Sequence, residues 1–142
     1  MKKEIIIVTI SLGNDGAERI LTELARQWVH DGHHITVIQT SPNRYGNEYA
    51  LEEGIEQIQI HTTSSNKVIR FIQEIKELIK ILKTRPNATC LSFLSASSFI
   101  LAISSWFVKN RIVFRSEIIR VRCLLVGINK RCVILPFALL MR

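Results

Sequence analysis

The sequence predicts an α/β fold, a Rossmann-like parallel sheet with helices on both faces. A strand is expected over residues 4–10, because residues 5–10 form a β-branched, mainly apolar run without alternation, which is typical of a strand covered on both sides. A turn containing Gly13 and Gly16 leads from this run into an amphipathic helix. Strand-like and helix-like segments then continue to alternate, and this order implies parallel strands joined by crossover helices.

The first half of the chain contains a helix between two strands. We expect the helix over residues 16–30, ended by Gly32, and the next strand over 34–40. The helix has apolar residues at the three-and-four spacing of a buried stripe: Ala17, Ile20, Leu21, Leu24, Ala25, Trp28 and Val29. Residues 41–54 contain proline and glycine and are expected to form a loop, and a short strand follows over 56–61.

A second long helix is expected over residues 66–83, with Pro86 just beyond its end. We expect one apolar face to pack against the sheet: Val68, Phe71, Ile72, Ile75, Ile79 and Leu82. The lysine, arginine and glutamate residues, Glu74 among them, are expected to form solvated faces. A strand over 90–94, a helix over 97–108 and a strand over 111–114 complete the pattern.

Residues 88–108 contain no charged side chain, and this length is about what a bilayer-spanning helix needs. A membrane segment is therefore an alternative for this region. Six serines and the fit to the strand–helix alternation favour a buried strand followed by a buried helix.

The predicted topology brings three distant segments to one edge of the sheet. The loop from Gly13 to Gly16, the serines Ser95 and Ser97, and the pair Ser116–Glu117 all follow the carboxyl ends of strands. Ligands of open parallel sheets bind beyond these ends. The free N–H groups of a helix that begins near Gly16 suit a phosphate or carboxylate at this edge.

The spacing Gly13-x-x-Gly16 is by itself a weak phosphate signal. It is neither the Gly-x-Gly-x-x-Gly of dinucleotide folds nor the Gly-Lys-Ser/Thr ending of a triphosphate loop. On spacing alone, a tight strand-to-helix turn is the favoured explanation of the glycines. A dinucleotide enzyme is disfavoured further because Gln39 and Thr40, not an acid, end the second strand.

The string Gly16-Ala-Glu-Arg-Ile-Leu-Thr-Glu-Leu-Ala25, followed by Asp31-Gly-His-His-Ile-Thr-Val-Ile38, is more specific. It resembles the N-terminal domain of family 4 glycosyltransferases, which are retaining, nucleotide-sugar-dependent enzymes of the GT-B fold. Asp15 stands where a glycine is common in that family. The resemblance implies a domain that holds the acceptor and lends backbone N–H groups to the donor diphosphate, while a C-terminal domain binds the nucleotide-sugar.

The resemblance implies a donor-diphosphate or substrate-binding role for six residues: Gly13, Gly16, Glu18, Arg19, Ser116 and Glu117. Simpler interpretations stay open for Glu18, as an acid at a helix N-terminus, and for Arg19, as the partner of Glu23 at i,i+4. No catalytic residue can be assigned. The histidines lack ligand spacing, so we expect no metal, and we expect no cofactor beyond the nucleotide-sugar substrate.

The resemblance ends after Glu117. The family commonly continues Ser-Glu-x-Asn-x-Pro, whereas Ile118 departs from that pattern, so we expect a domain over 1–117 and a basic, apolar tail over 118–142. A shifted reading frame at this point is the favoured interpretation, and a genuine tail is the alternative. Because the donor-binding domain is missing, we expect little or no turnover from this chain alone.

Charge supports a second hypothesis. Residues 109–142 hold eight of the 19 Lys and Arg residues and only one acid, Glu117, so they supply the whole net charge of +7. A basic, non-catalytic module would bind anionic membrane or nucleic acid through this region. Under the favoured hypothesis the partners are a nucleotide-sugar and a glycan or lipid-linked acceptor, with no nucleic acid. That hypothesis places the protein in the cytoplasm, with peripheral contact at the inner membrane face as an option.

Overall fold

The computed structural model describes residues 2–13, 16–41, 51–92, 95–115 and 132–135. They form one six-stranded sheet in the order β3-β2-β1-β4-β5-β6, in which all pairings are parallel. The strands are β1 (Glu4–Thr9), β2 (His34–Gln39), β3 (Ile55–Gln59), β4 (Thr89–Ser92), β5 (Arg111–Arg115) and β6 (Cys132–Leu135). The predicted α/β fold is therefore confirmed.

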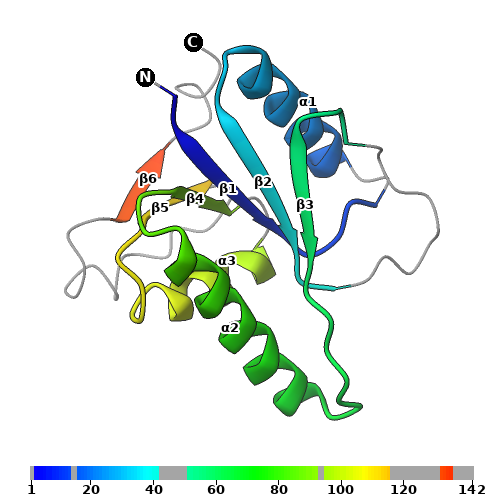
Figure 1. Ribbon diagram of the computed structural model, residues 1–142. Helices are drawn as coiled ribbons and strands as arrows, with labels where there is room; N and C mark the ends of the chain where they lie inside the picture. The colour runs from blue at the N-terminus through cyan, green and yellow to red at the C-terminus, as the bar shows by residue number, and fades with distance from the viewer. Residues whose placement is uncertain (1, 14–15, 42–50, 93–94, 116–131, 136–142) are drawn as a thin grey trace.

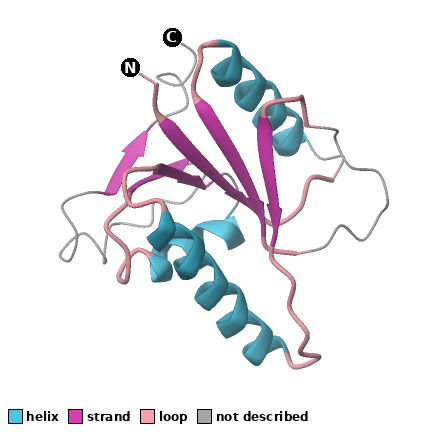
Figure 2. Ribbon diagram, in the orientation of Figure 1, coloured by secondary structure: helices cyan, strands magenta, loops and turns pink. Residues whose placement is uncertain are grey.

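In the described ranges, three helices cover the sheet. Helix α1 (Gly16–His30) lies on one face, and α2 (Lys67–Thr84) and α3 (Ser95–Ser104) lie on the other (Figures 1 and 2). Helix α1 begins and ends where the apolar spacing predicts. Helix α2 begins one residue later than predicted, because Asn66 is its N-cap: the Asn66 side chain accepts a hydrogen bond from the Val68 N–H.

Each face of the sheet has its own apolar core. The α1 side is built around Ile7, Leu21 and Ile35, all fully buried. The α2 and α3 side is built around Ile6, Leu78 and Leu101, which are also fully buried. Successive strand residues alternate between the two cores because strand side chains point to opposite faces. The unbroken apolar run of β1 is explained by burial on both sides.

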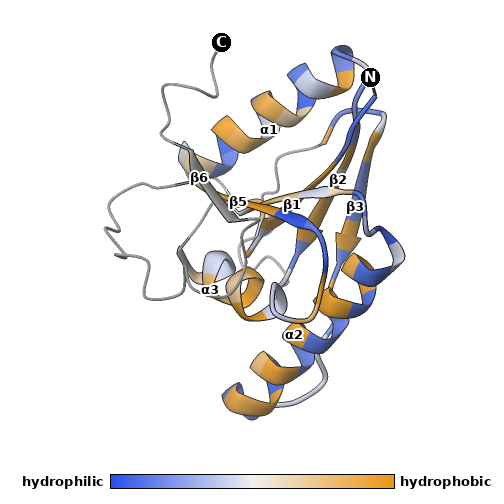
Figure 3. Cartoon of the chain, turned by 90° about the vertical axis from the view of Figure 1, so that its left-hand side faces the viewer, coloured by the Kyte–Doolittle hydropathy of each residue, from blue (hydrophilic) through white to orange (hydrophobic). Residues whose placement is uncertain are grey.

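The predicted apolar face of α2 is wrong in its first half. Val68 is 66% exposed and Ile72 is 46% exposed. The first turns of α2 extend past the carboxyl ends of the strands, where there is no sheet to pack against (Figure 1). Figure 3 shows this free end of α2 as strongly apolar. Packing on the sheet begins one turn later, at Glu74 and Leu78.

The uncharged stretch 88–108 is a strand followed by a helix, as its serines favour. Strand β4 is buried between β1 and β5, and α3 buries Ile100 and Leu101 against the sheet. Helix α3 is 10 residues long. In the described part of the chain, no helix combines the length and apolarity that crossing a bilayer requires.

Strand β6 was not predicted. It lies within the basic tail, where the sequence has no clear periodicity, and pairs with β5 from Ile112 and Cys132 to Arg115 and Leu135. The parallel pairing covers the outer edge of β5, which is otherwise open to pairing with another chain. The rest of the tail, 118–131 and 136–142, lies outside the described residues, as do residues 42–50 of the predicted loop.

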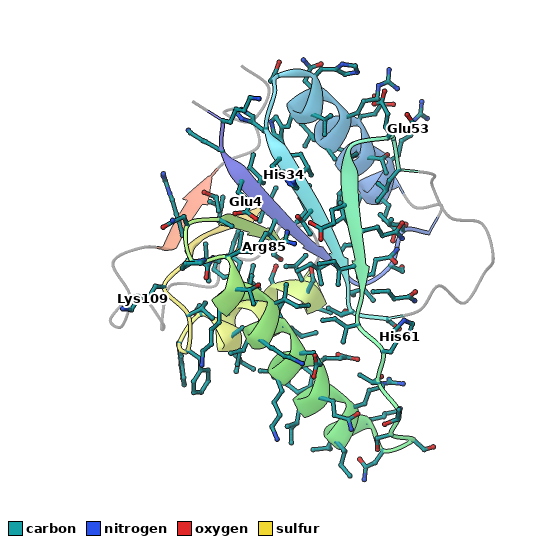
Figure 4. All side chains as sticks on the ribbon, viewed as in Figure 1. Glu4, His34, Glu53, His61, Arg85 and Lys109 are labelled. Atoms are coloured by element: carbon teal, nitrogen blue, oxygen red, sulfur yellow. The ribbon has the colours of Figure 1, made fainter. Side chains whose placement is uncertain are left out.

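A polar cluster closes the opposite, amino-terminal edge of the sheet. The guanidinium of Arg85, just after α2, donates to Glu56 Oε1 at 2.8 Å and to Thr36 Oγ1 at 2.5 Å. It also lies 3.5 Å from the carboxylate of Glu4, a neighbour that Figure 4 labels. Asn110 donates to the Arg85 carbonyl at 2.6 Å. The cluster therefore ties β1, β2 and β3 to the end of α2.

Candidate functional site

The carboxyl-terminal edge of the sheet brings together two of the three segments that the topology predicts. Strands β1 and β4 are direct neighbours, with Val8 paired to Ser92, so the loop after β1 and the start of α3 lie at the same edge. Strand β5 ends at this edge too, because Phe114 pairs with Ser92. Ser116 and Glu117 come next in the sequence but lie outside the described residues.

Glu18 supports the loop between β1 and α1 from inside. Although it is charged, it is only 4% exposed. Ser11 donates a hydrogen bond to Glu18 Oε1 at 3.1 Å, and a Cβ built on Gly13 would stand 3.2 Å from Glu18 Oε2. The carboxylate also lies in the first turn of α1, where a negative charge is favourable. A Cβ at position 13 would therefore make a tight contact with the Glu18 carboxylate, which would have to shift by a few tenths of an ångström.

Gly16 has a different environment, at the exposed first residue of α1. Among the described residues, no atom beyond its chain neighbours and its own helix backbone lies within 4 Å of a Cβ built on Gly16. Packing among the described residues therefore does not require a glycine here. Close approach of a ligand to the helix N-terminus is another reason for a glycine at position 16.

Arg19 is exposed on the first turn of α1. Its carbonyl accepts a hydrogen bond from the Thr22 hydroxyl at 2.8 Å. Within the described ranges, Glu23 pairs with Arg26 at 3.8 Å and not with Arg19, so the predicted i,i+4 pair is absent. Arg19 is therefore an exposed residue of the first turn of α1, next to the loop after β1.

Alanine substitutions at the two glycines are expected to change the stability of the fold in opposite directions. Gly16→Ala is expected to stabilise the fold by about 0.7 kcal/mol, because alanine restricts the unfolded chain and meets no clash. Gly13→Ala is expected to destabilise it by about 1 kcal/mol, because the new Cβ displaces the Glu18 carboxylate and weakens its bond to Ser11. Urea unfolding of both variants measures the difference. Equal effects of the two substitutions would contradict this account.

Serine hydroxyls fasten the start of α3 to the end of β4. The Ser92 Oγ lies 2.5 Å from the Ser98 Oγ and 3.4 Å from the Ser97 Oγ. Ser92 and Ser97 are fully buried. The contact between Ser92 and Ser98 therefore ties the start of α3 to the end of β4, and burial withholds the Ser92 and Ser97 hydroxyls from direct contact with a ligand.

Gln39 is a polar residue of this edge that the sequence reasoning did not single out as a site. It is the last residue of β2, is 1% exposed, and points to the α1 side together with Ile35 and Val37. Its Oε1 accepts a bond from Gln57 Nε2 at 3.1 Å, while its Nε2 has no partner among the described residues. Buried donors are rarely left unpaired, so this amide is a candidate ligand contact.

The sequence prediction for Glu74 is wrong: it is buried and not part of a solvated face. Only 9% of it is exposed, and its partner Arg70 lies 3.8 Å away. Glu74 precedes Leu78 and Leu82 at spacings of four, so it belongs to the stripe that faces the sheet. Burial raises the pKa of the Glu74 carboxyl above its ordinary value, and the Arg70 charge opposes that shift.

Replacing Glu74 by leucine is expected to stabilise the protein by about 1 kcal/mol at pH 7, because a buried charge is exchanged for an apolar side chain. The folded carboxyl holds its proton more tightly than the unfolded one. Its unfavourable effect therefore grows as the pH rises from below 4.5 through the raised folded pKa. Urea unfolding at pH 4 and pH 7 should show the larger gain at pH 7. A gain independent of pH would contradict this assignment.

The described residues offer little for metal or thiol chemistry. No group of three or more His, Cys, Asp or Glu side chains in the described part of the chain is placed to hold a metal ion. Burial, with a smaller contribution from the charge of Glu4, raises the pKa of the Cys90 thiol to about 12, so this cysteine stays protonated. The described polar groups at the carboxyl edge suit binding and orientation of a ligand.

Comparison with known proteins supports the fold. No protein-family model matches the chain, and no curated protein matches it by sequence. Among solved structures, a glycosyltransferase from Rickettsia africae ESF-5 is similar with a TM-score of 0.60 and 18% identity, over 81% of this chain and 30% of that chain. WaaG, a glycosyltransferase involved in lipopolysaccharide biosynthesis, is similar with a TM-score of 0.52 and 13% identity, over 80% of this chain and 39% of that chain.

These matches define the class of fold. The chain has an α/β, Rossmann-like domain of the kind found in glycosyltransferases. It spans less than two fifths of the length of either of these two structures. At this level of identity the likeness concerns the fold, and activity has to be argued from the residues of this chain.

Proposed function

We propose that residues 1–117 form the acceptor-side domain of a retaining, GT-B-type glycosyltransferase of family 4. The intact enzyme would transfer a sugar from a nucleotide-sugar to a cell-envelope or polysaccharide acceptor. The observation that carries the proposal is the exposed N-terminus of α1 at the carboxyl edge, where Gly16 leaves the helix end open. The glycosyltransferase-like fold supports it.

The proposed roles follow from position. The N–H groups at the start of α1 would stabilise negative charge on the leaving diphosphate, with Gly16 allowing close approach. The exposed Arg19 would add positive charge beside it. Glu18 and Gly13 would keep the loop in shape, because the Glu18 carboxylate is enclosed by the loop. Ser116 and Glu117 stay proposed contacts of the same edge.

Gly16→Ala provides a direct test, because it adds a methyl group at the proposed contact without disturbing the fold. Thermal unfolding with UDP-glucose, UDP-N-acetylglucosamine and GDP-mannose should raise the melting temperature of the natural chain for at least one donor. Gly16→Ala should lose this shift, and Glu23→Ala, on the next turn of α1, should keep it. Absence of any shift, or an equal shift in both variants, would contradict the proposal.

A second expectation concerns turnover. Because the proposed donor-binding domain is not part of residues 1–117, a purified polypeptide of residues 1–142 should give little or no sugar transfer with the same nucleotide-sugars. Robust transfer would show that the donor site lies within this chain and would overturn the proposed division of roles.

We also propose peripheral contact with an anionic membrane, consistent with a lipid-linked acceptor and a cytoplasmic location. The observation that favours it is the free end of α2, where Val68, Phe71 and Ile72 are exposed beside Lys67 and Arg70. An apolar surface with a basic border suits the headgroup region of a bilayer. A non-catalytic module that binds membrane or nucleic acid through 109–142 is the alternative.

Vesicle sedimentation separates these two surfaces. The chain should sediment with vesicles that contain phosphatidylglycerol, and less with vesicles of pure phosphatidylcholine. The double substitution Phe71→Ser with Ile72→Ser should abolish binding to the phosphatidylglycerol vesicles. Binding that survives the double substitution, or that DNA competes away, would favour the tail at 109–142 instead. High salt should weaken the interaction in either case.

A further inference from the structure

An aromatic loop, residues 105–110, joins α3 to β5 at the amino-terminal edge of the sheet. Trp106 is 56% exposed and Phe107 is 58% exposed. Phe99, on α3, is 62% exposed and precedes Trp106 by about two helical turns, a spacing that puts both rings on the same side of the helix. Single exposed apolar side chains are ordinary, whereas a group of them marks a surface that contacts another molecule.

The aromatic loop holds its two rings outward. Ser105 and Val108, which flank the rings in sequence, are buried. The N–H groups of Trp106 and Phe107 donate to carbonyls in the last turn of α3, at 3.3 and 3.0 Å. The buried Asn110 donates to the carbonyls just after α2 and just before β4, at 2.6 and 3.2 Å. The exposure of the rings is therefore a feature of the folded loop and not of a frayed helix end.

The border of the aromatic loop is basic. Lys109 in the loop and Arg111 directly after it are exposed, and Lys83 is exposed on the last turn of α2. Figure 4 shows Lys109 on the loop that follows α3. Residues 78–116 contain six Lys and Arg residues and no Asp or Glu. The carboxylates that approach from β1 and β3 are bound by Arg85, so the loop presents apolar rings within a positively charged surface.

Charge and chemistry indicate the kind of partner. In an isologous dimer the same patch meets itself, so the basic borders of two copies would face and repel one another. Nucleic acid would match the charge, but bases stack on aromatic rings, and the exposed start of α2 is aliphatic at Val68 and Ile72. An anionic bilayer matches both features, because tryptophan suits the headgroup level and basic side chains are attracted to anionic lipids.

We propose that the aromatic loop inserts Trp106 and Phe107 into the headgroup region of an anionic bilayer, with Lys109 and Arg111 beside the lipid phosphates. This site is distinct from the free end of α2, which extends past the opposite edge of the sheet. With both sites engaged, the α2 and α3 side of the sheet faces the bilayer and α1 faces away from it (Figure 1). That orientation rests on the membrane contact proposed for α2, whereas insertion of the loop rests on the loop's own residues.

Tryptophan fluorescence tests the insertion, because the chain contains only two tryptophans. Trp28 lies on α1, on the other face of the sheet, so Trp28→Phe leaves Trp106 as the single reporter. Vesicles that contain phosphatidylglycerol should shift the Trp106 emission to shorter wavelength, and lipids brominated on their acyl chains should quench it. Trp106→Phe, in which only Trp28 emits, should show neither change. If Trp28→Phe does not fold, the difference between the natural chain and Trp106→Phe gives the same signal.

Substitutions in the aromatic loop should weaken binding to the same vesicles. Trp106→Ser with Phe107→Ser should lower the partition coefficient by about tenfold, because two aromatic side chains no longer leave water. Arg111→Glu should also weaken binding, because it replaces an attractive charge by a repulsive one. Arg26→Glu, on α1, is the matched control: it changes the net charge equally and should keep most of the binding.

The outcomes separate this site from the one on α2. Sedimentation with vesicles but no Trp106 shift would overturn this inference and leave the α2 contact standing. A Trp106 shift that persists in Phe71→Ser with Ile72→Ser would support the aromatic loop and overturn the α2 contact. A shift with single-stranded DNA and none with vesicles would identify nucleic acid as the partner and overturn the proposal. A shift that grows with protein concentration in the absence of lipid would identify a second copy and overturn it too.

Discussion

Replacing Arg85 with alanine is expected to lower the free energy of unfolding by about 2 kcal/mol, because charge-assisted hydrogen bonds to a half-buried partner are lost. The guanidinium makes contacts of 2.8 Å with both carboxylate oxygens of Glu56. It also donates to Thr36 and lies beside Glu4, so its removal leaves two acids without their shared cation at the amino edge of the sheet. Urea unfolding at pH 7 measures the loss.

Lys80→Ala is the matched control for Arg85→Ala. Lys80 also pairs with a glutamate, Glu77, but at 3.8 Å and with both side chains largely exposed. Such pairs contribute about 0.5 kcal/mol or less. If both alanine variants are equally stable, the polar cluster does not hold the amino edge together as inferred here.

The same cluster predicts how the stability of the fold changes as the pH falls. Hydrogen bonding to Arg85, with help from Thr36 and despite partial burial, lowers the pKa of Glu56 below its ordinary value of 4.5. Glu56 therefore contributes its stabilisation above pH 4.5 and loses it as the pH falls through the lowered folded pKa. Unfolding measured from pH 6 down to pH 3 should show a smaller acid loss in Arg85→Ala than in the natural chain. If the free energy of unfolding falls equally with pH in both proteins, groups other than Glu56 cause the acid loss.

Leu78→Ala is expected to have the largest effect on stability, a loss of about 3 kcal/mol. Leu78 is fully buried on the stripe of α2 that packs against the sheet. Its truncation removes apolar contacts with the core that contains Ile6 and Leu101 and leaves a cavity there. Denaturant unfolding gives the value directly.

Ile72→Ala is the control on the same helix, six residues earlier. Because Ile72 lies on the part of α2 that extends past the sheet, its truncation should change the free energy of unfolding by about 0.5 kcal/mol or less. A loss comparable to that of Leu78→Ala would mean that the start of α2 is packed, and the proposed membrane surface would then be wrong.

The sequence predicts the fold well where burial and chain periodicity agree. Helix α1 is found at the predicted residues because its apolar stripe packs along its whole length. Helix α2 shows why the rest could not be predicted. Its apolar residues continue beyond the strand ends, and a helical period cannot indicate where the sheet stops. Strand β6 was missed because its apolar run is only four residues long and stands in a tail without clear periodicity, and so short a run does not distinguish a strand from part of a helix.

The candidate site was predictable in place but not in detail. The order of strands and helices is enough to locate the carboxyl edge and the loop at Gly13. The inward orientation of Glu18 and the unpaired amide of Gln39 depend on contacts between segments far apart in the sequence. Gln39 alone left a signal, as a long polar side chain directly after the apolar pair Val37 and Ile38 at the end of β2. Ser116 and Glu117 stay predictions.

The measurement that tests the central claim most directly is a map of nucleotide-sugar contacts on the full chain by amide chemical shifts. The account predicts that UDP- or GDP-sugars shift the signals of Gly13, Gly16 and Arg19 at the carboxyl edge. Signals around Arg85 and Glu56, at the amino edge, should not move. Shifts confined to the amino edge or the basic tail, or no shifts with any donor, would contradict the assignment of this edge to glycosyl transfer.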